Sequence, residues 1–96
     1  MRTAARIDSN QTEIINAFRK LGCSVWPTHQ LGKGFPDAVV AKNCKTVLVE
    51  IKDGSKAKSA RVLTQDEQKF HDNWRGIVLI VENLSDVIDA VKGLER

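Results

Sequence analysis

The 96-residue chain contains no tyrosine, and aromatic residues make up only 5% of it. Proteins that bind single strands by base stacking present aromatic platforms, so this composition argues against that mode of binding. We therefore expect Trp26 and Trp74 to be core or interface residues. No apolar run approaches the roughly 20 residues that a helix needs to cross a bilayer. The segment from Met1 to Ser9 lacks the apolar stretch of a signal peptide. These two absences predict a soluble, cytoplasmic protein with no membrane partner.

Metal-binding and nucleophile motifs are also scarce. Cys23 and Cys44 have no metal-ligand spacing, and we do not expect a disulfide in an intracellular chain. His29 and His71 lack a second cysteine or histidine at ligand spacing, so they are not expected to hold zinc. The chain contains no phosphate-binding Walker loop, no Ser-His-Asp order and no dinucleotide fingerprint.

Length and charge give weak priors. Ninety-six residues predict one domain, and a net charge of +3 with a pI near 9.1 is mildly basic. The basic residues are concentrated in residues 52–61, where four of them accompany one acid. This segment is either a solvated loop or a surface that contacts phosphates. The candidate phosphate contacts are Lys56, Lys58 and Arg61, with Lys33 from the loop over 28–36.

The most informative residues are two carboxylates and a lysine at the ends of two apolar, β-branched segments. Strands are expected over about 37–42 and 45–52. A symmetric hairpin between them pairs Ala41 with Thr46, and therefore Asp37 with Glu50. Directly opposed carboxylates would repel by about 3–4 kcal/mol at an effective dielectric near 20. Lys52 shares the strand face of Glu50. A proton or a cation is therefore expected beside the pair, in a site suited to an anion.

The remaining elements complete an αβββαβα order, which predicts an α/β fold with a mixed central sheet flanked by helices. Asp8 or Ser9 is expected to cap the first helix, whose buried stripe contains Ile14, Phe18 and Leu21. A short strand follows over 23–26. Thr64 and Glu67 form a capping box for a helix that buries Phe70 and Trp74. A strand over 77–81 reads as covered on both faces, and Ser85 is expected to cap the last helix.

Several of these motifs occur together in a known family. The strings are Gly-Phe-Pro-Asp at 34–37 and Val-Glu-Ile-Lys-Asp-Gly at 49–54, followed by Leu-Thr and a helix with Gln68 and an aromatic residue. The chain resembles the PD-(D/E)XK nuclease superfamily. Within it, the chain is similar to the short, stand-alone phage and bacterial members of the VRR-NUC family. The resemblance implies a restriction-endonuclease-like core and Mg²⁺- or Mn²⁺-dependent cleavage of phosphodiester bonds, often in branched DNA. It also implies a homodimer.

The resemblance assigns residues as well. Glu13 corresponds to the first-helix glutamate of the family, and Asp37 to the Pro-Asp aspartate. Glu50 and Lys52 correspond to its Glu-x-Lys pair. Gln68 corresponds to its helix glutamine, although Gln65 lies on the same helix.

The chemistry of the residues agrees with this assignment. Mg²⁺ typically takes one or two protein carboxylates, which Asp37 and Glu50 supply, with the Ile51 carbonyl as a third ligand. Lys52 would orient the attacking water and stabilise charge in the transition state. The alternatives are a structural ion pair between Glu50 and Lys52, and a Glu13 that only stabilises the first turn of its helix. At the level of function, the alternatives are a DNA-binding module that has lost catalysis and a sequence-specific restriction-type enzyme.

Overall fold

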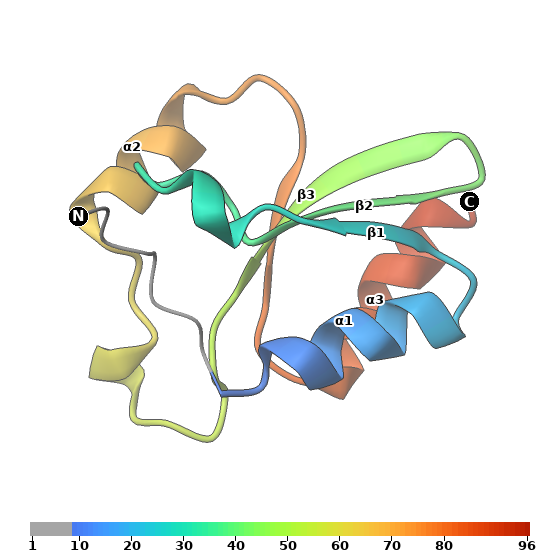
Figure 1. Cartoon of the computed structure of the whole chain (residues 1–96), viewed down its shortest axis with the longest axis horizontal. Helices are drawn as coiled ribbons and strands as arrows, with labels where there is room; N and C mark the ends of the chain where they lie inside the picture. The colour runs from blue at the N-terminus through green and yellow to red at the C-terminus, as the bar shows by residue number, and fades with distance from the viewer. Residues whose placement is uncertain (1–8) are drawn as a thin grey trace.

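The computed structural model describes residues 9–96 (Figure 1). The described chain is an α/β fold in which helices flank one four-stranded mixed sheet, as the sequence predicts. The strand order is β1-β2-β3-β4, with β3 and β4 parallel and the other neighbours antiparallel. The elements are α1 (Gln11–Lys20), β1 (Ser24–Pro27), β2 (Ala38–Lys42), β3 (Lys45–Ile51), α2 (Gln65–Asn73), β4 (Val78–Val81) and α3 (Leu84–Leu94). Two 3₁₀ turns, η1 (His29–Leu31) and η2 (Lys58–Ala60), lie in the loops.

The predicted register of the central hairpin is confirmed. Ala41 lies opposite Thr46, and Ala38 lies opposite Val49. The two turn residues, Asn43 and Cys44, both have left-handed backbone angles, with φ of 56° and 64°. Such angles suit a two-residue turn whose twist matches that of the strands. The turn therefore fixes the register that brings the residue before β2 towards the end of β3.

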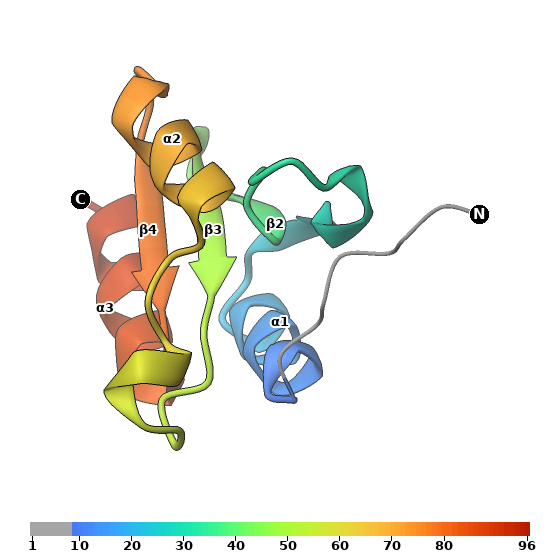
Figure 2. The same cartoon turned by 90° about the vertical axis from the view of Figure 1, so that its left-hand side faces the viewer.

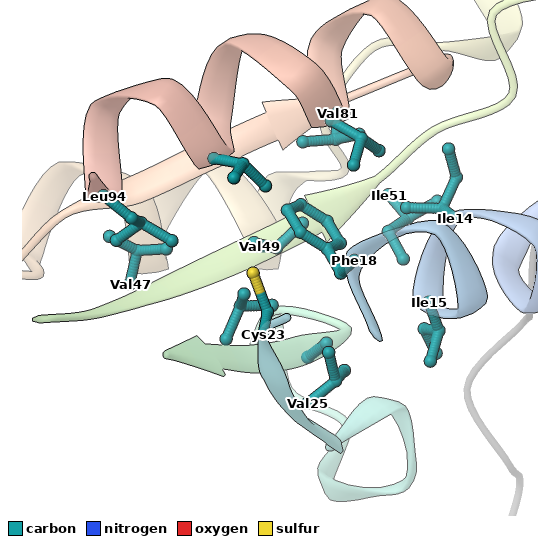
Figure 3. Close-up of a cluster of buried hydrophobic side chains, with 14 residues drawn as sticks. Ile14, Ile15, Phe18, Cys23, Val25, Val47, Val49, Ile51, Val81 and Leu94 are labelled. Atoms are coloured by element: carbon teal, nitrogen blue, oxygen red, sulfur yellow. The ribbon is translucent and has the colours of Figure 1, made fainter. Parts of the chain in front are cut away.

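The core lies between the sheet and two helices. Figures 1 and 2 show α1 and α3 side by side on one face of the sheet. Their buried residues pack on alternate residues of the strands, as the close-up of the core shows (Figure 3). The buried cluster is Ile14, Ile15, Phe18, Cys23, Val25, Ala38, Val40, Val47, Val49, Ile51, Val81, Val87, Val91 and Leu94. One fully covered face is what the period-two alternation of the strands requires.

Two expectations for α1 are wrong. Leu21 is 40% exposed, because the helix ends at Lys20 and the chain turns away at Gly22, whose φ is 89°. The capping residue is Asn10, and the Ser9 hydroxyl donates instead to Asp53, at 2.6 Å. The alternative cap, Asp8, lies outside the described residues.

The second face of the sheet is covered only in part. Figure 2 shows α2 near one end of the strands. Trp26 is 75% exposed, so the expectation of a core residue is wrong. The strand over 77–81 was expected to be covered on both faces, yet Ile77 and Ile80 are 60% and 46% exposed. The physical reason is that β4 is an edge strand of the described sheet and α3 covers only one of its faces.

The predicted capping box of α2 is confirmed. The Thr64 hydroxyl accepts a hydrogen bond from the Glu67 backbone, and the Glu67 carboxylate accepts one from the Thr64 backbone. The expected full burial of Phe70 and Trp74 is wrong, because Phe70 is only partly buried and Trp74, which follows α2, is 45% exposed. Their rings instead stack on each other at 5.1 Å, and the Phe70 ring meets that of Phe35 edge-on at 5.1 Å. The helix is thus held largely through the loop that precedes β2.

The last helix begins two residues earlier than expected. Its cap is Asn83, whose side chain accepts from the Asp86 backbone, rather than Ser85. Within residues 9–96, no helix combines the length and apolar character needed to cross a membrane.

Candidate active site

Asp37 and Glu50 lie at the end of the sheet opposite the hairpin turn. Asp37 directly precedes β2, and Glu50 is the next-to-last residue of β3. The Ile51 N–H donates to Oδ2 of Asp37 at 2.7 Å, and the Asp37 N–H donates to the Val49 carbonyl at 2.9 Å. Both carboxyl groups are therefore positioned by the backbone of β3. The hydrogen bond from the Ile51 N–H was not expected from the sequence, and the Ile51 carbonyl as a metal ligand stays a prediction.

Lys52 connects this pair to α2. Its Nζ lies 2.8 Å from Oε1 of Glu67 and 3.8 Å from Oε2 of Glu50. Only the first distance is that of a hydrogen bond. Sequence reasoning assigned Glu67 to the capping box alone. No sequence signal places it beside Lys52, because that contact depends on where α2 packs.

Burial and mutual repulsion set the charges in this site. Only 2% of Glu50 is exposed. Its burial, together with the charges of Asp37 and Glu67, raises the pKa of Glu50 to about 10. Burial also raises the pKa of Asp37, although the hydrogen bond from Ile51 opposes the shift. Burial acts in the same direction on Glu67, but hydrogen bonds from Lys52 and Thr64 outweigh it and lower the pKa of Glu67. At neutral pH, Glu50 is therefore protonated in the metal-free protein.

The pair fits a hard divalent cation. Within residues 9–96, Oε1 of Glu50 is buried and accepts no hydrogen bond, and a buried polar atom left in this way is costly. Three carboxylates gather around one lysine, so the fully ionised cluster has a formal charge of −2. Oxygen ligands are those that Mg²⁺ prefers. Among the described residues, no three His, Cys, Asp or Glu side chains form a metal-ligating group. Asp37 and Glu50 supply two neighbouring carboxyl groups, a number sufficient for Mg²⁺.

The structure does not bring two of the expected site residues to this pair. Glu13 is on the exposed side of α1 and lines a separate hollow of about 710 Å³ with Asp53 and Glu82. Gln68 is exposed, and its amide donates to Oδ1 of Asp72 at 2.8 Å, one turn along the helix.

The junction after β3 is held rigidly beside the site. The amide of Asn10 donates to the carbonyls of Lys52 and Glu82, at 3.1 and 3.2 Å. Hydrogen bonds from Ser55 and Ser9 lower the pKa of Asp53 to about 2. These contacts fix the end of β3, which carries Glu50 and Lys52, against α1 and the end of β4.

The candidate phosphate-binding residues differ in their surroundings. Lys33, Lys56 and Lys58 are exposed. Arg61 forms an ion pair with Glu82 at 3.1 Å, so part of its charge is satisfied within the protein. His29 is half-buried, and its Nδ1 lies 3.1 Å from the amide nitrogen of Gln11. The exposed lysines are therefore the better candidates for phosphate contacts.

Two buried carboxyl groups, one of them protonated, and a lysine held between two acids form a site that could bind a divalent cation and an anion together. Comparisons with family models, with curated proteins and with solved structures found no match for this chain.

Proposed function

We propose that the protein is a Mg²⁺- or Mn²⁺-dependent endonuclease that hydrolyses phosphodiester bonds in DNA. The observation that carries the proposal is the buried Glu50 beside Asp37 and Lys52, one oxygen of which accepts no hydrogen bond from the described part of the chain. The resemblance to VRR-NUC nucleases supports it, because the resembling motifs supply these same three residues. The observed αβββαβα order is compatible with the restriction-endonuclease-like core that we propose for the fold.

Each residue of the site has a role in this proposal. Asp37 and Glu50 would hold the cation, with the Ile51 carbonyl as a third ligand. When bound, a divalent cation supplies charge neutralisation and lowers the pKa of bound water. Ile51 keeps the Asp37 carboxylate in place through its N–H. Lys52 would orient the attacking water and stabilise negative charge on the phosphate. Glu13 and Gln68 are not required.

The direct test is cleavage of labelled DNA with Mg²⁺, with Mn²⁺ and with EDTA. The substrates should include duplex, flap, splayed-arm and four-way DNAs. We expect metal-dependent cuts that favour the branched substrates, because a chain of this size has little surface for base readout. Binding without cleavage would instead indicate a DNA-binding module. Discrete fragments from a long duplex would indicate a sequence-specific enzyme.

The exposed lysines of the loop after β3 should set the salt dependence of DNA binding. Each phosphate contact contributes about 0.9 to the slope of log affinity against log salt for duplex DNA. We expect the variant with Lys56→Ala and Lys58→Ala to lose about 1.8 from this slope. Arg61→Ala should change it less, because Arg61 is paired with Glu82. Fluorescence anisotropy across a salt series measures the slope. An unchanged slope in the double variant would show that Lys56 and Lys58 belong to a solvated loop and do not contact phosphates.

We also propose that the protein is a C₂ homodimer. The resemblance implies it, and the edge strand β4 offers a surface for it, since exposed Ile77 and Ile80 accompany an unpaired strand edge in the described sheet. An edge strand can pair antiparallel with its own copy across a two-fold axis. Two sites would then face two strands of a branched DNA.

Ile77→Lys should therefore convert the dimer to a monomer without unfolding it, because Ile77 is 60% exposed directly before β4. The reason is that the new charge would be buried only in the assembled protein. Light scattering at micromolar concentration should give about twice 10.7 kDa for the unaltered protein and 10.7 kDa for the variant. Leu31→Lys is the matched control, because Leu31 is exposed on η1, away from β4 and α3. A monomeric unaltered protein would contradict the dimer proposal.

A further inference from the structure

Lys52 needs a partner other than Glu50. A lysine carries its charge on a flexible four-carbon stem, so its ammonium is placed only by what it contacts. The Nζ atom lies 3.8 Å from Glu50, which is too long for a hydrogen bond, and 2.8 Å from Glu67. The Lys52 side chain is only 10% exposed, so water can do little to hold it. Of its two contacts with Glu50 and Glu67, only the one with Glu67 is a hydrogen bond.

The position of Glu67 is itself fixed. Its Oε1 accepts from the Thr64 N–H at 2.8 Å as well as from Lys52, so the carboxylate is tied to the start of α2. The first turn of α2 packs closely on the loop before β2. Gly34 lies there with a φ of 82°, and a Cβ on it would collide with the backbone of Asp66. The edge-on contact between Phe35 and Phe70 joins the same loop to α2. The loop that leads to Asp37 therefore also positions Glu67.

We propose that Glu67 is a positioning residue, which holds the ammonium of Lys52 beside the Asp37–Glu50 pair. The importance of Glu67 for DNA cleavage rests on the proposed function, whereas its contact with Lys52 is observed directly. Oε1 of Glu67 then has two roles, since it accepts the capping-box hydrogen bond from Thr64 and a hydrogen bond from Lys52. Charge-assisted hydrogen bonds of this length are among the stronger polar contacts in proteins. Preorganised charge of this kind contributes most where it need not rearrange during the reaction.

The first test follows the ammonium of Lys52 by NMR in ¹⁵N-labelled, metal-free protein. An ammonium that is held and shielded exchanges slowly with water and gives a visible ¹⁵Nζ signal, which Lys52→Arg assigns by its disappearance. We expect Glu67→Ala to abolish this signal and Glu67→Gln to retain it in part, because the amide oxygen still accepts. Thr64→Ala is the control for the capping box, since it removes the hydroxyl but not the contact with Lys52. Asp66→Asn is the control for charge, because Asp66 is exposed on the same turn.

Three results of this experiment would overturn the proposal. The first is the lack of a protected Lys52 signal in the unaltered protein. The second is an unchanged signal in Glu67→Ala. The third is an equal loss in Thr64→Ala, which would show that Glu67 acts only through the helix start. Retention in both controls with loss in Glu67→Ala would support it.

The second test is kinetic and concerns the site in use. We expect Glu67→Ala to lower kcat about 10- to 100-fold while KM changes less than about twofold, with partial recovery in Glu67→Gln. A rise in KM alone would overturn the positioning role, because it would indicate lost substrate binding. If the unaltered protein cleaves no DNA, the proposed function fails, and the NMR signal still decides whether Glu67 positions Lys52.

Discussion

Replacement of Asp37 by asparagine is expected to reduce metal-dependent cleavage to background while leaving the fold intact. Asparagine keeps the size of the side chain, and its carbonyl oxygen can still accept the hydrogen bond from Ile51. It removes the negative charge that a divalent cation needs. Lys52→Ala should lower the rate by about 10²- to 10³-fold, as expected for the loss of one preorganised charge in an active site.

Thermal unfolding separates this outcome from simple destabilisation. In the metal-free protein, Asp37→Asn should have an equal or higher melting temperature, because burial, with a smaller effect from the charge of Glu67, raises the pKa of Asp37 and makes its charge unfavourable. Asp66→Asn, an exposed acid in the first turn of α2, provides the charge-matched control and should cleave normally. Undiminished cleavage by both the Asp37 and Lys52 variants would show that the catalytic site lies elsewhere.

Glu50→Gln is expected to stabilise the metal-free protein, and the gain should grow with pH. The pKa of Glu50 is about 10 in the folded protein, against an ordinary value of 4.5. Between these values the folded state binds a proton that the unfolded state has lost, so the free energy of unfolding falls as pH rises. One proton corresponds to a slope of up to about 1.4 kcal/mol per pH unit. Glutamine cannot ionise, so the variant should lack this part of the slope.

Denaturant unfolding in EDTA at several values between about pH 5 and pH 9 measures the effect. The unaltered protein and Glu50→Gln should have similar stability near pH 5 and diverge above it. Added Mg²⁺ or Mn²⁺ should stabilise the unaltered protein near pH 8, since a ligand that binds only the folded state raises its stability. The cation should leave Glu50→Gln nearly unchanged. Parallel pH profiles for the two proteins would contradict the raised pKa of the buried Glu50.

The register of the hairpin is the part of the site that local sequence determined. Period-two alternation and a four-residue turn at 42–45 suffice to align β2 with β3, because a slip of one residue would turn every side chain to the other face. Asp37, Glu50 and Lys52 meet as a direct result. The capping box at Thr64 is equally local, since its two hydrogen bonds join residues three apart.

Exposure was determined by the tertiary structure. The apolar run over 77–81 reads as a strand in any context, but only the strand order makes β4 an edge and leaves Ile80 half-exposed. Trp26 is exposed for a related reason, since no helix of residues 9–96 covers its face of the sheet along much of its length. The hydrophobicity of a residue shows that its side chain can be buried. It does not show whether another helix or strand covers that side chain in the fold.

The same distinction separates the two acids of the site. Glu50 could be identified from the sequence because its neighbours along the strand and across the hairpin are fixed by pairing. Glu67 could not, because its contact with Lys52 depends on where α2 packs. That packing depends on the close approach of Gly34 to α2 and on the contact between Phe35 and Phe70. The sequence alone thus determined which residues pair within the hairpin. The packing of α2 decided which carboxylate holds Lys52. The reason is that side chains distant along the chain meet only when their helices and strands pack together.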